Sequence, residues 1–118
     1  MKKINLGQNE VIHFVGIGGI GMSGLAQIMK NMGFKIQGSD QIRNKNTMSC
    51  SKAGIKVYIG HSKKNLKSSS ILVRSSAIKN NNCEIKFARS KKSNYRFYSV
   101  KLSNRDHERV LLGEVELR

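Results

Sequence analysis

The chain has 118 residues, enough for one domain with a usable core, and a net charge of +15. Its basic residues are spread over both halves without interleaved aromatic side chains, so we expect a solvated basic surface and no nucleic-acid partner. The two cysteines lack metal-binding spacing, the N-terminus is too polar for a signal peptide, and no apolar run approaches membrane-spanning length. We therefore expect a cytoplasmic protein that makes no membrane contact.

The first third of the chain predicts a strand, a helix and a second strand. Residues 11–16, VIHFVG, form a short apolar run that leads into glycines and is typical of a buried strand. Apolar residues recur at helical spacing over residues 22–32, and Gly33 is placed to end that helix in a left-handed conformation. Residues 34–40, FKIQGSD, then favour a second strand that ends in polar residues.

The middle of the chain continues this alternation of helix and strand. A weaker helix is expected at residues 46–53, stopped by Gly54, and a third strand at residues 55–60. Residues 62–66 favour a short helical turn that begins at a serine. Residues 70–77, SILVRSSA, favour a fourth strand.

The last third of the chain is less regular. An asparagine-capped helix is expected at residues 84–91, and YRFYSVKL at residues 95–102 favours a fifth strand. Residues 103–118 show neither period clearly, so we expect an irregular tail there. Strands that alternate with helices over short links predict an α/β fold, with a doubly wound parallel sheet of four to five strands in a single domain.

A glycine-rich stretch, HFVGIGGIGMSGLA at residues 13–26, joins the first strand to the first helix. Gly16 permits a tight turn, Gly18 allows the backbone to approach a pyrophosphate, and Gly21 allows the helix to pack closely on the strand. Unpaired N–H groups at the helix N-terminus favour an anion. The stretch predicts a phosphate or nucleotide site, and glycines required only for packing are the alternative.

Other polar residues should lie at the same rim of the sheet, because the carboxyl ends of parallel strands meet there. They are Asp40, His61, Ser75 and Ser76. Each also has an ordinary structural interpretation: the aspartate could cap a helix, the histidine could belong to a loop, and serines are common in turns. His13 lies inside a strand, and we expect its role to be structural.

The sequence shows no recognisable catalytic arrangement. It contains no paired carboxylates, no Ser/His/Asp or Cys/His set, no metal-ligand spacing and no G-x-x-x-x-G-K-[ST] phosphate loop for ATP. We therefore expect a binding site without catalytic or metal-ligating residues.

Four segments, in this order and spacing, resemble the UDP-N-acetylmuramate–L-alanine ligases, the MurC type of the Mur ligase family. They are HFVGIGGIGMSGLA, GFKIQGSD, AGIKVYIGH and VRSSAI, and they span roughly residues 10–90. The murein-peptide-recycling relatives of these ligases share the first pattern and the later S-S-A-I. The resemblance implies a Rossmann-like domain at residues 1–92 that binds the UDP part of UDP-N-acetylmuramic acid, the substrate to which these ligases add L-alanine in peptidoglycan precursor synthesis.

The resemblance also assigns roles to single residues. The diphosphate is expected to be held by the loop residues Gly16, Ile17, Gly18, Gly19, Ile20 and Gly21. Three residues are expected near the uridine: Ser39, Asp40 and His61. The opposite wall is expected to be lined by Ser75, Ser76 and Ala77.

Full-length members of that family add a central ATPase domain and a C-terminal domain. They use ATP and magnesium to activate the muramoyl carboxylate as an acyl phosphate, which the amine of L-alanine attacks, so no cofactor is expected in this chain. From about Ser93 the resemblance ends, and residues 93–118 form a divergent C-terminal segment in place of the family's route to the ATP loop. We therefore expect a truncated or frameshifted ligase that is inactive alone.

Other functions stay open beside this one. An NAD-binding module of a dehydrogenase shares the glycine turn and the acidic residue but does not predict the S-S-A-I or G-H segments. A part of a murein-peptide ligase fits the same motifs. A basic nucleic-acid-binding protein is favoured only by the net charge.

Overall fold

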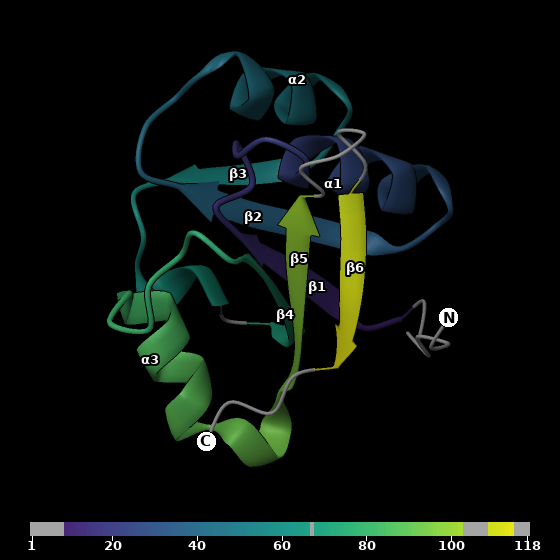
Figure 1. Cartoon of the computed structure of the whole chain (residues 1–118). Coiled ribbons are helices and arrows are strands. Elements are labelled where there is room, and N and C mark those ends of the chain that lie inside the picture. Colours follow the sequence, from purple (N-terminus) through teal and green to yellow (C-terminus); the bar gives the residue numbers. More distant parts are fainter. Residues whose placement is uncertain (1–8, 67, 103–108, 115–118) are drawn as a thin grey trace.

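The computed structural model describes residues 9–66, 68–102 and 109–114, and a sheet in the order β3-β2-β1-β4-β5-β6 forms its centre (Figure 1). The strands are β1 (Val11–Val15), β2 (Lys35–Asp40), β3 (Lys56–Ile59), β4 (Ser69–Ser75), β5 (Arg96–Leu102) and β6 (Arg109–Glu114). The helices are α1 (Met22–Asn31), α2 (Lys45–Lys52) and α3 (Cys83–Ser90), with short 3-10 turns η1 (Lys63–Leu66) and η2 (Lys92–Asn94). The first five strands are parallel, which confirms the predicted doubly wound α/β fold.

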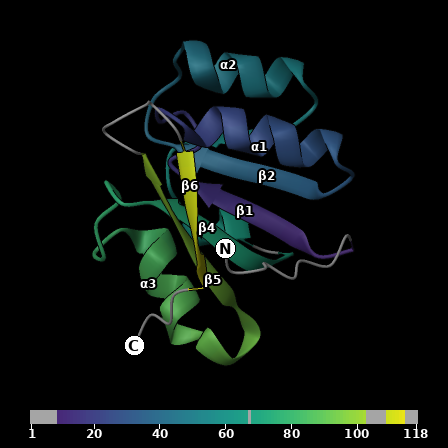
Figure 2. The same ribbon diagram turned by 45° about the vertical axis from the view of Figure 1, so that its right-hand side comes forward.

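The helices cover both faces of the sheet, with α1 and α2 on one side and α3 on the other (Figure 2). Side chains alternate along β1, so they pack into two separate apolar clusters, one on each face of the sheet. Ile12 and Phe14 join the cluster under α1 and α2. Val15 joins the cluster under α3, and His13 points to that same face. The single polar residue inside β1 therefore faces α3.

Two helices end at the glycines expected to stop them. The Gly33 N–H donates to the Lys30 carbonyl and the Phe34 N–H to the Met29 carbonyl, with Gly33 at φ +99°. This is the Schellman arrangement, which satisfies carbonyls at the last helical turn. Gly54 ends α2 in the same way, with φ +91°.

The C-terminal part of the chain differs from the expected irregular tail. The fifth strand is confirmed as β5, but residues 109–114 form β6, which runs antiparallel to β5 with Leu102 opposite Arg109. Without β6, β5 would present a row of unpaired N–H and C=O groups, so a returning segment gains hydrogen bonds there even without a clear hydrophobic period. The rest of the predicted tail, residues 103–108 and 115–118, lies outside the described residues.

Candidate ligand-binding site

The glycine-rich loop lies where the strand order reverses. β1 is flanked by β2 on one side and β4 on the other, and the loop leaves the carboxyl end of β1 between them. The N–H groups of Gly16 and Ile17 both donate to the Ser39 carbonyl, at 2.9 and 3.0 Å, so the loop is tied to the end of β2. In open α/β sheets this reversal point is where ligands bind.

Gly18 lies too close to its neighbours to carry a side chain. A Cβ there would lie 2.7 Å from Cγ2 of Thr47 and 2.8 Å from Oδ2 of Asp40. The Gly18 N–H donates to the same Asp40 oxygen at 2.7 Å, while the other oxygen accepts from the Gln41 N–H. Asp40 therefore closes the glycine loop, whereas the N-cap of α2 is Asn44.

The end of the loop presents backbone donors. The Gly19 N–H is satisfied by the Gly16 carbonyl at 3.0 Å. Within the described part of the chain, the N–H groups of Ile20 and Gly21 donate to no protein acceptor. Gly21 is the N-cap of α1, where no side chain of the described residues makes a cap hydrogen bond, and Ile20 is 78% exposed. This geometry suits an anion at the N-terminus of α1.

A surface cavity of about 370 Å³ lies beside the loop. It is lined by Asp40, Gln41, His61, Ala77, Ile78, Lys79, Asn81 and Asn82. A Cβ on Gly16 would lie 2.9 Å from Cδ1 of Ile78, so the cavity wall and the glycine loop are in contact. Three residues that the family resemblance assigns to the ligand, Asp40, His61 and Ala77, thus line one cavity.

The two serines after β4 do not line that cavity. The Ser75 hydroxyl accepts a hydrogen bond from the Ala77 N–H at 3.0 Å, as serines in turns do. The Ser76 N–H donates to the Val100 carbonyl at 3.2 Å. Their backbone shapes the segment that carries Ala77, and direct ligand contact by their hydroxyls stays a prediction.

Arg74, on β4, holds the segment after β4 that carries Ala77. Its side chain is 8% exposed, and its guanidinium donates to Oδ1 of Asn80 at 2.7 Å and to the Ile78 carbonyl. Burial lowers the pKa of Arg74, and the charge of Arg89 adds to that effect. The hydrogen bonds therefore secure a buried guanidinium that holds the cavity wall in place.

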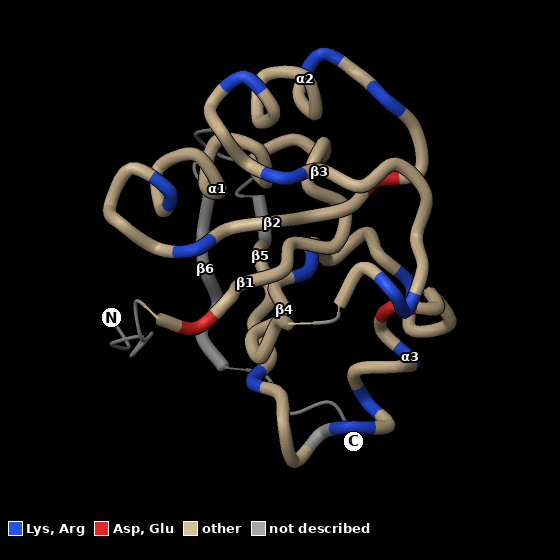
Figure 3. The backbone as a smooth tube through the Cα atoms, turned by 180° about the vertical axis from the view of Figure 1, so that it is seen from behind, with Lys and Arg blue, Asp and Glu red and all other residues tan. Residues whose placement is uncertain are grey.

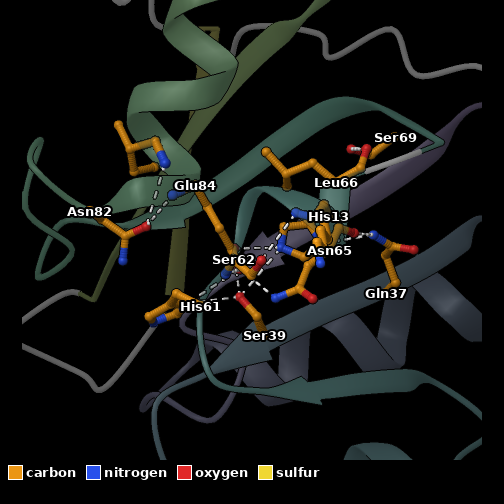
Figure 4. Close-up of polar contacts among 12 residues, drawn as sticks. His13, Gln37, Ser39, His61, Ser62, Asn65, Leu66, Ser69, Asn82 and Glu84 are labelled. Atoms are coloured by element: carbon orange, nitrogen blue, oxygen red, sulfur yellow. Dashed lines mark hydrogen bonds and ion pairs between the residues drawn. The ribbon is translucent and has the colours of Figure 1, made fainter.

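Behind the cavity, a buried carboxylate gathers polar groups from several elements (Figure 4). Glu84, at the start of α3, has no exposed surface. One of its oxygens accepts from Nε2 of His13 at 2.8 Å and from Oγ of Ser39 at 2.6 Å. The other accepts from the Ser62 N–H at 3.0 Å and from Nδ2 of Asn65 at 2.8 Å. The cluster joins β1, β2, η1 and α3.

His61 connects this cluster to the cavity. Its Nδ1 lies 2.9 Å from Oγ of Ser39 and 3.5 Å from Oε2 of Glu84. Burial alone would raise the pKa of Glu84, but hydrogen bonds from His13, His61 and Ser39 outweigh it and lower that pKa far below its usual range. The hydrogen bond to Glu84 raises the pKa of His61, burial opposes this, and the charges of Glu84 and Asp40 reinforce the rise.

The sequence did not predict that Ser39 and Glu84 form a buried polar cluster. Ser39 is fully buried, and its hydroxyl belongs to the Glu84 cluster instead of the cavity lining. Glu84 was expected only as part of a helix start, although it is bonded to a histidine 71 residues earlier in the chain. The available signal was the polar face formed by His13, Gln37 and Ser39, because buried polar side chains require partners. The structural role expected for His13 is confirmed.

The described residues offer neither a cluster of metal ligands nor a helix that could span a membrane. No group of three or more His, Cys, Asp or Glu side chains could hold a metal ion there, and the whole sequence lacks an ATP phosphate loop. No helix in the same part of the chain is both long enough and apolar enough to cross a bilayer.

The basic residues do not concentrate at this site. Lysine and arginine are distributed over helices, strand ends and loops (Figure 3). Two carboxylates, Asp40 and Glu84, lie at or behind the cavity, while Lys79 lines it. The site therefore combines backbone N–H donors with a local balance of charges, which differs from a continuous basic surface for nucleic acid.

The chain is similar to known proteins of one family. A family model described as "Mur ligase family, catalytic domain" matches residues 11–103. UDP-N-acetylmuramate–L-alanine ligases from Pelagibacter ubique and Rickettsia typhi are 61% and 54% identical over 83 and 81 residues, which are 70% and 69% of this chain. Those matches cover 18% and 16% of the two relatives, so the chain spans less than a fifth of their length.

Solved structures show the same relationship. The UDP-N-acetylmuramate–alanine ligase MurC of Thermotoga maritima matches with a TM-score of 0.66 and 36% identity, over 69% of this chain and 19% of that one. A UDP-N-acetylmuramate:L-alanyl-gamma-D-glutamyl-meso-diaminopimelate ligase from Neisseria meningitides matches with a TM-score of 0.65 and 28% identity, over 76% and 28%. The chain belongs to the Mur ligase family, in which it corresponds to the N-terminal domain of the UDP-N-acetylmuramate–L-alanine ligases.

Proposed function

We propose that this domain binds the UDP part of UDP-N-acetylmuramic acid at the cavity beside the glycine loop. The observation that carries the proposal is the glycine loop at the point where strand order reverses. Its Ile20 and Gly21 N–H groups donate to no acceptor in the described part of the chain, and its Gly16 borders a cavity of about 370 Å³. The donors suit a diphosphate, and the adjoining cavity suits the nucleoside.

The loop residues have different parts in this proposal. Ile20 and Gly21 donate to the diphosphate, and Gly16, Ile17, Gly18 and Gly19 shape the turn that brings those donors forward. Asp40 and His61 lie near the uridine, and Ser39 acts from the buried cluster through His61. The opposite wall is formed by Ser75, Ser76 and Ala77.

Both oxygens of Asp40 accept backbone N–H groups, and the acidic residue at this position bears on the choice between a dinucleotide and a uridine diphosphate. In NAD-binding domains an acidic residue at the end of the second strand accepts the ribose hydroxyls. Here one oxygen of Asp40 accepts the Gly18 N–H and the other the Gln41 N–H. The carboxylate therefore closes the glycine loop, and titration with NADH beside UDP distinguishes a dinucleotide from a uridine diphosphate ligand.

In a complete ligase, this domain would present UDP-N-acetylmuramic acid to the ATP-dependent step that joins it to L-alanine. Holding the diphosphate at α1 fixes the muramoyl group at a set distance from the domain, which is how positioning contributes to amide formation. The described residues supply binding and orientation, and we expect no ligation by this chain alone.

Isothermal titration of the chain with UDP, UDP-N-acetylmuramic acid and NADH tests the proposal. UDP and UDP-N-acetylmuramic acid should compete for one site, with no heat from NADH. Ala77→Phe should weaken UDP at least about tenfold because an aromatic ring would occupy part of the cavity. Ala53→Phe, at an exposed position at the end of α2, is the matched control and should bind normally. NADH binding without UDP binding would overturn the proposal.

A further inference from the structure

The hydrogen bonds around Glu84 determine where the protons of the cluster lie. Nε2 of Gln37 donates to the Asn65 carbonyl at 2.7 Å and to Nδ1 of His13 at 2.8 Å. Because Nδ1 of His13 accepts, its proton is on Nε2, which donates to Glu84 at 2.8 Å. This histidine is thus fixed in one tautomer by Gln37 and Glu84.

Ser39 determines the position of a proton on His61. A hydroxyl has one proton, and that of Ser39 is donated to Glu84 at 2.6 Å. Ser39 Oγ therefore accepts from Nδ1 of His61, at 2.9 Å, so this nitrogen carries a proton. The inward nitrogen of His61 is a donor whether the ring is neutral or charged.

The other ring nitrogen of His61, Nε2, is not buried. In the described part of the chain, every buried side-chain nitrogen or oxygen has a hydrogen-bond partner. Nε2 of His61 has none in that part, so it is accessible, and the ring lines the cavity of about 370 Å³. Figure 4 shows one edge of the His61 ring directed at Ser39 and Glu84, through the Nδ1 contacts described above.

We propose that Glu84 is a positioning residue for the ligand site, which holds His61 with Nδ1 turned inward and Nε2–H presented to the cavity as a hydrogen-bond donor. The acceptor is a carbonyl or anionic oxygen of the nucleoside diphosphate. This inference rests on the proposed function and deepens it, because Glu84 acts on the ligand through His61 without touching it.

The charges around His61 support the cationic form of the ring. Glu84 approaches from α3, with its carboxylate 3.5 Å from Nδ1, and Asp40 lines the same cavity from β2. His13 lies behind Glu84 on β1. The opposing cations are exposed lysines from η1, from the segment after β4 and from α3: Lys63, Lys79 and Lys86. The hydrogen-bonded carboxylate outweighs these solvated charges, and the pKa of His61 is raised accordingly.

Nuclear magnetic resonance of the imidazole nitrogens in the ligand-free chain tests the positioning role directly. The wild-type His61 should carry a proton on Nδ1 throughout the titration and should titrate above 6.5, the ordinary value of the imidazole. Glu84→Gln should bring its pKa to or below about 6.5, because the neutral amide no longer favours the imidazolium. An unprotonated Nδ1, or the same titration in Glu84→Gln, would overturn the proposal.

A second variant covers the case in which Glu84→Gln does not fold. Ser39→Ala deletes only the hydroxyl that accepts from Nδ1 of His61. It should release the ring, so that both tautomers are observed. A single unchanged tautomer in Ser39→Ala would contradict the arrangement just as clearly.

Titration with UDP between about pH 5.5 and about pH 8.5 then tests the ligand contact. The wild-type affinity should fall about tenfold as pH rises through the raised pKa of His61, because Nε2 loses the proton it donates. Glu84→Gln should bind weakly and with a flatter profile, whereas Glu10→Gln, the same chemical change at a residue paired with Arg96, should keep the wild-type profile.

The two experiments separate this inference from the proposed function. A wild-type affinity that is flat or rises with pH would overturn the donor role of Nε2. If UDP does not bind at any pH while His61 shows the fixed tautomer and responds to Glu84→Gln, the proposed function fails and the positioning of His61 by Glu84 stands.

Discussion

Gly18 links the ligand loop to β2 and α2 by having no side chain. Its N–H donates to Asp40, and its carbonyl accepts from Nδ2 of Asn46 at 3.0 Å. A loop that must bring backbone donors to a ligand requires such close support, because loosely held donors lose the benefit of being preorganised.

Replacing Gly18 with alanine tests that support. The added Cβ would lie 2.7 to 3.0 Å from atoms of Thr47, Asp40 and Asn44. We expect a loss of about 1–3 kcal/mol in the free energy of unfolding and weaker UDP binding, because Asp40 must move. Gly54→Ala, at φ +91° with its nearest neighbour 3.6 Å from the new Cβ, is the control. It should cost stability but leave UDP affinity unchanged, and equal affinity in both variants would contradict this role of Gly18.

The Glu84–His61 pair predicts a dependence of stability on pH. Glu84 has a lowered pKa, so its contribution is complete above its ordinary value of 4.5 and is lost as pH falls below that value. His61 has a raised pKa, so its contribution is complete below 6.5 and is lost as pH rises through its folded value. The pair therefore stabilises the fold most between these two ordinary values.

Calorimetric melting temperatures of the wild type and Glu84→Gln, compared across pH, measure this contribution. The difference between the two curves should be largest between pH 4.5 and pH 6.5 and should shrink on both sides. Taking the difference removes the general effect of the net charge of +15 on stability. Parallel curves would show that the pair is not coupled to folding.

At the scale of elements, the sequence predicted helices and strands well wherever glycines mark the ends. Gly33 and Gly54 are required at helix ends by their left-handed conformations, and Gly60 follows β3 at φ +97°. Such local signals need only a few neighbouring residues. β6 has no comparable signal, because what stabilises it is the free edge of β5, a partner that exists only after the sheet has formed.

The residues of the candidate site show the same difference between features set by strand order and features set by tertiary packing. The glycine loop, Asp40 and His61 were predicted because strand order alone brings the carboxyl ends of parallel strands together. Glu84 was not, since it reaches His13 across 71 residues and is placed by the packing of α3. The helix dipole by itself favours an acidic residue in the first turn of a helix. The presence of Glu84 there therefore does not indicate from the sequence that its carboxylate is buried and paired.

The cap of α3 determines where Glu84 lies, and this gives a prediction for that helix. The Asn82 side chain accepts from the N–H groups of Glu84 at 2.9 Å and Ile85 at 3.4 Å. Asn82→Ala should lower the free energy of unfolding by about 1 kcal/mol, whereas Asn82→Asp keeps the acceptor and should remain close to the wild type. Urea denaturation measures both. Equal losses in the two variants would show that the cap hydrogen bonds contribute little.

At the scale of the whole molecule, β6 distinguishes this domain from a purely parallel sheet. It pairs with β5 from Tyr98 opposite Glu114 to Leu102 opposite Arg109, so the edge of β5 is not available for other strands. The opposite edge strand, β3, has four residues and carries Lys56 at an exposed position. A short, charged edge strand such as β3 resists pairing with another molecule. β5 is longer, so its edge would pair more readily if β6 did not cover it.

Ending the chain after Leu102 tests what β6 contributes. The removal uncovers the N–H and C=O groups along β5, so the shortened chain should unfold at lower urea concentration and associate as its concentration rises. Sedimentation velocity over a range of concentrations detects that association. A chain that lacks only residues 115–118 keeps β6 and serves as the control, with the stability of the full chain expected. If both shortened chains match the full chain in stability and sedimentation, the β5 edge needs no cover, and the sheet of five parallel strands is sufficient for the fold.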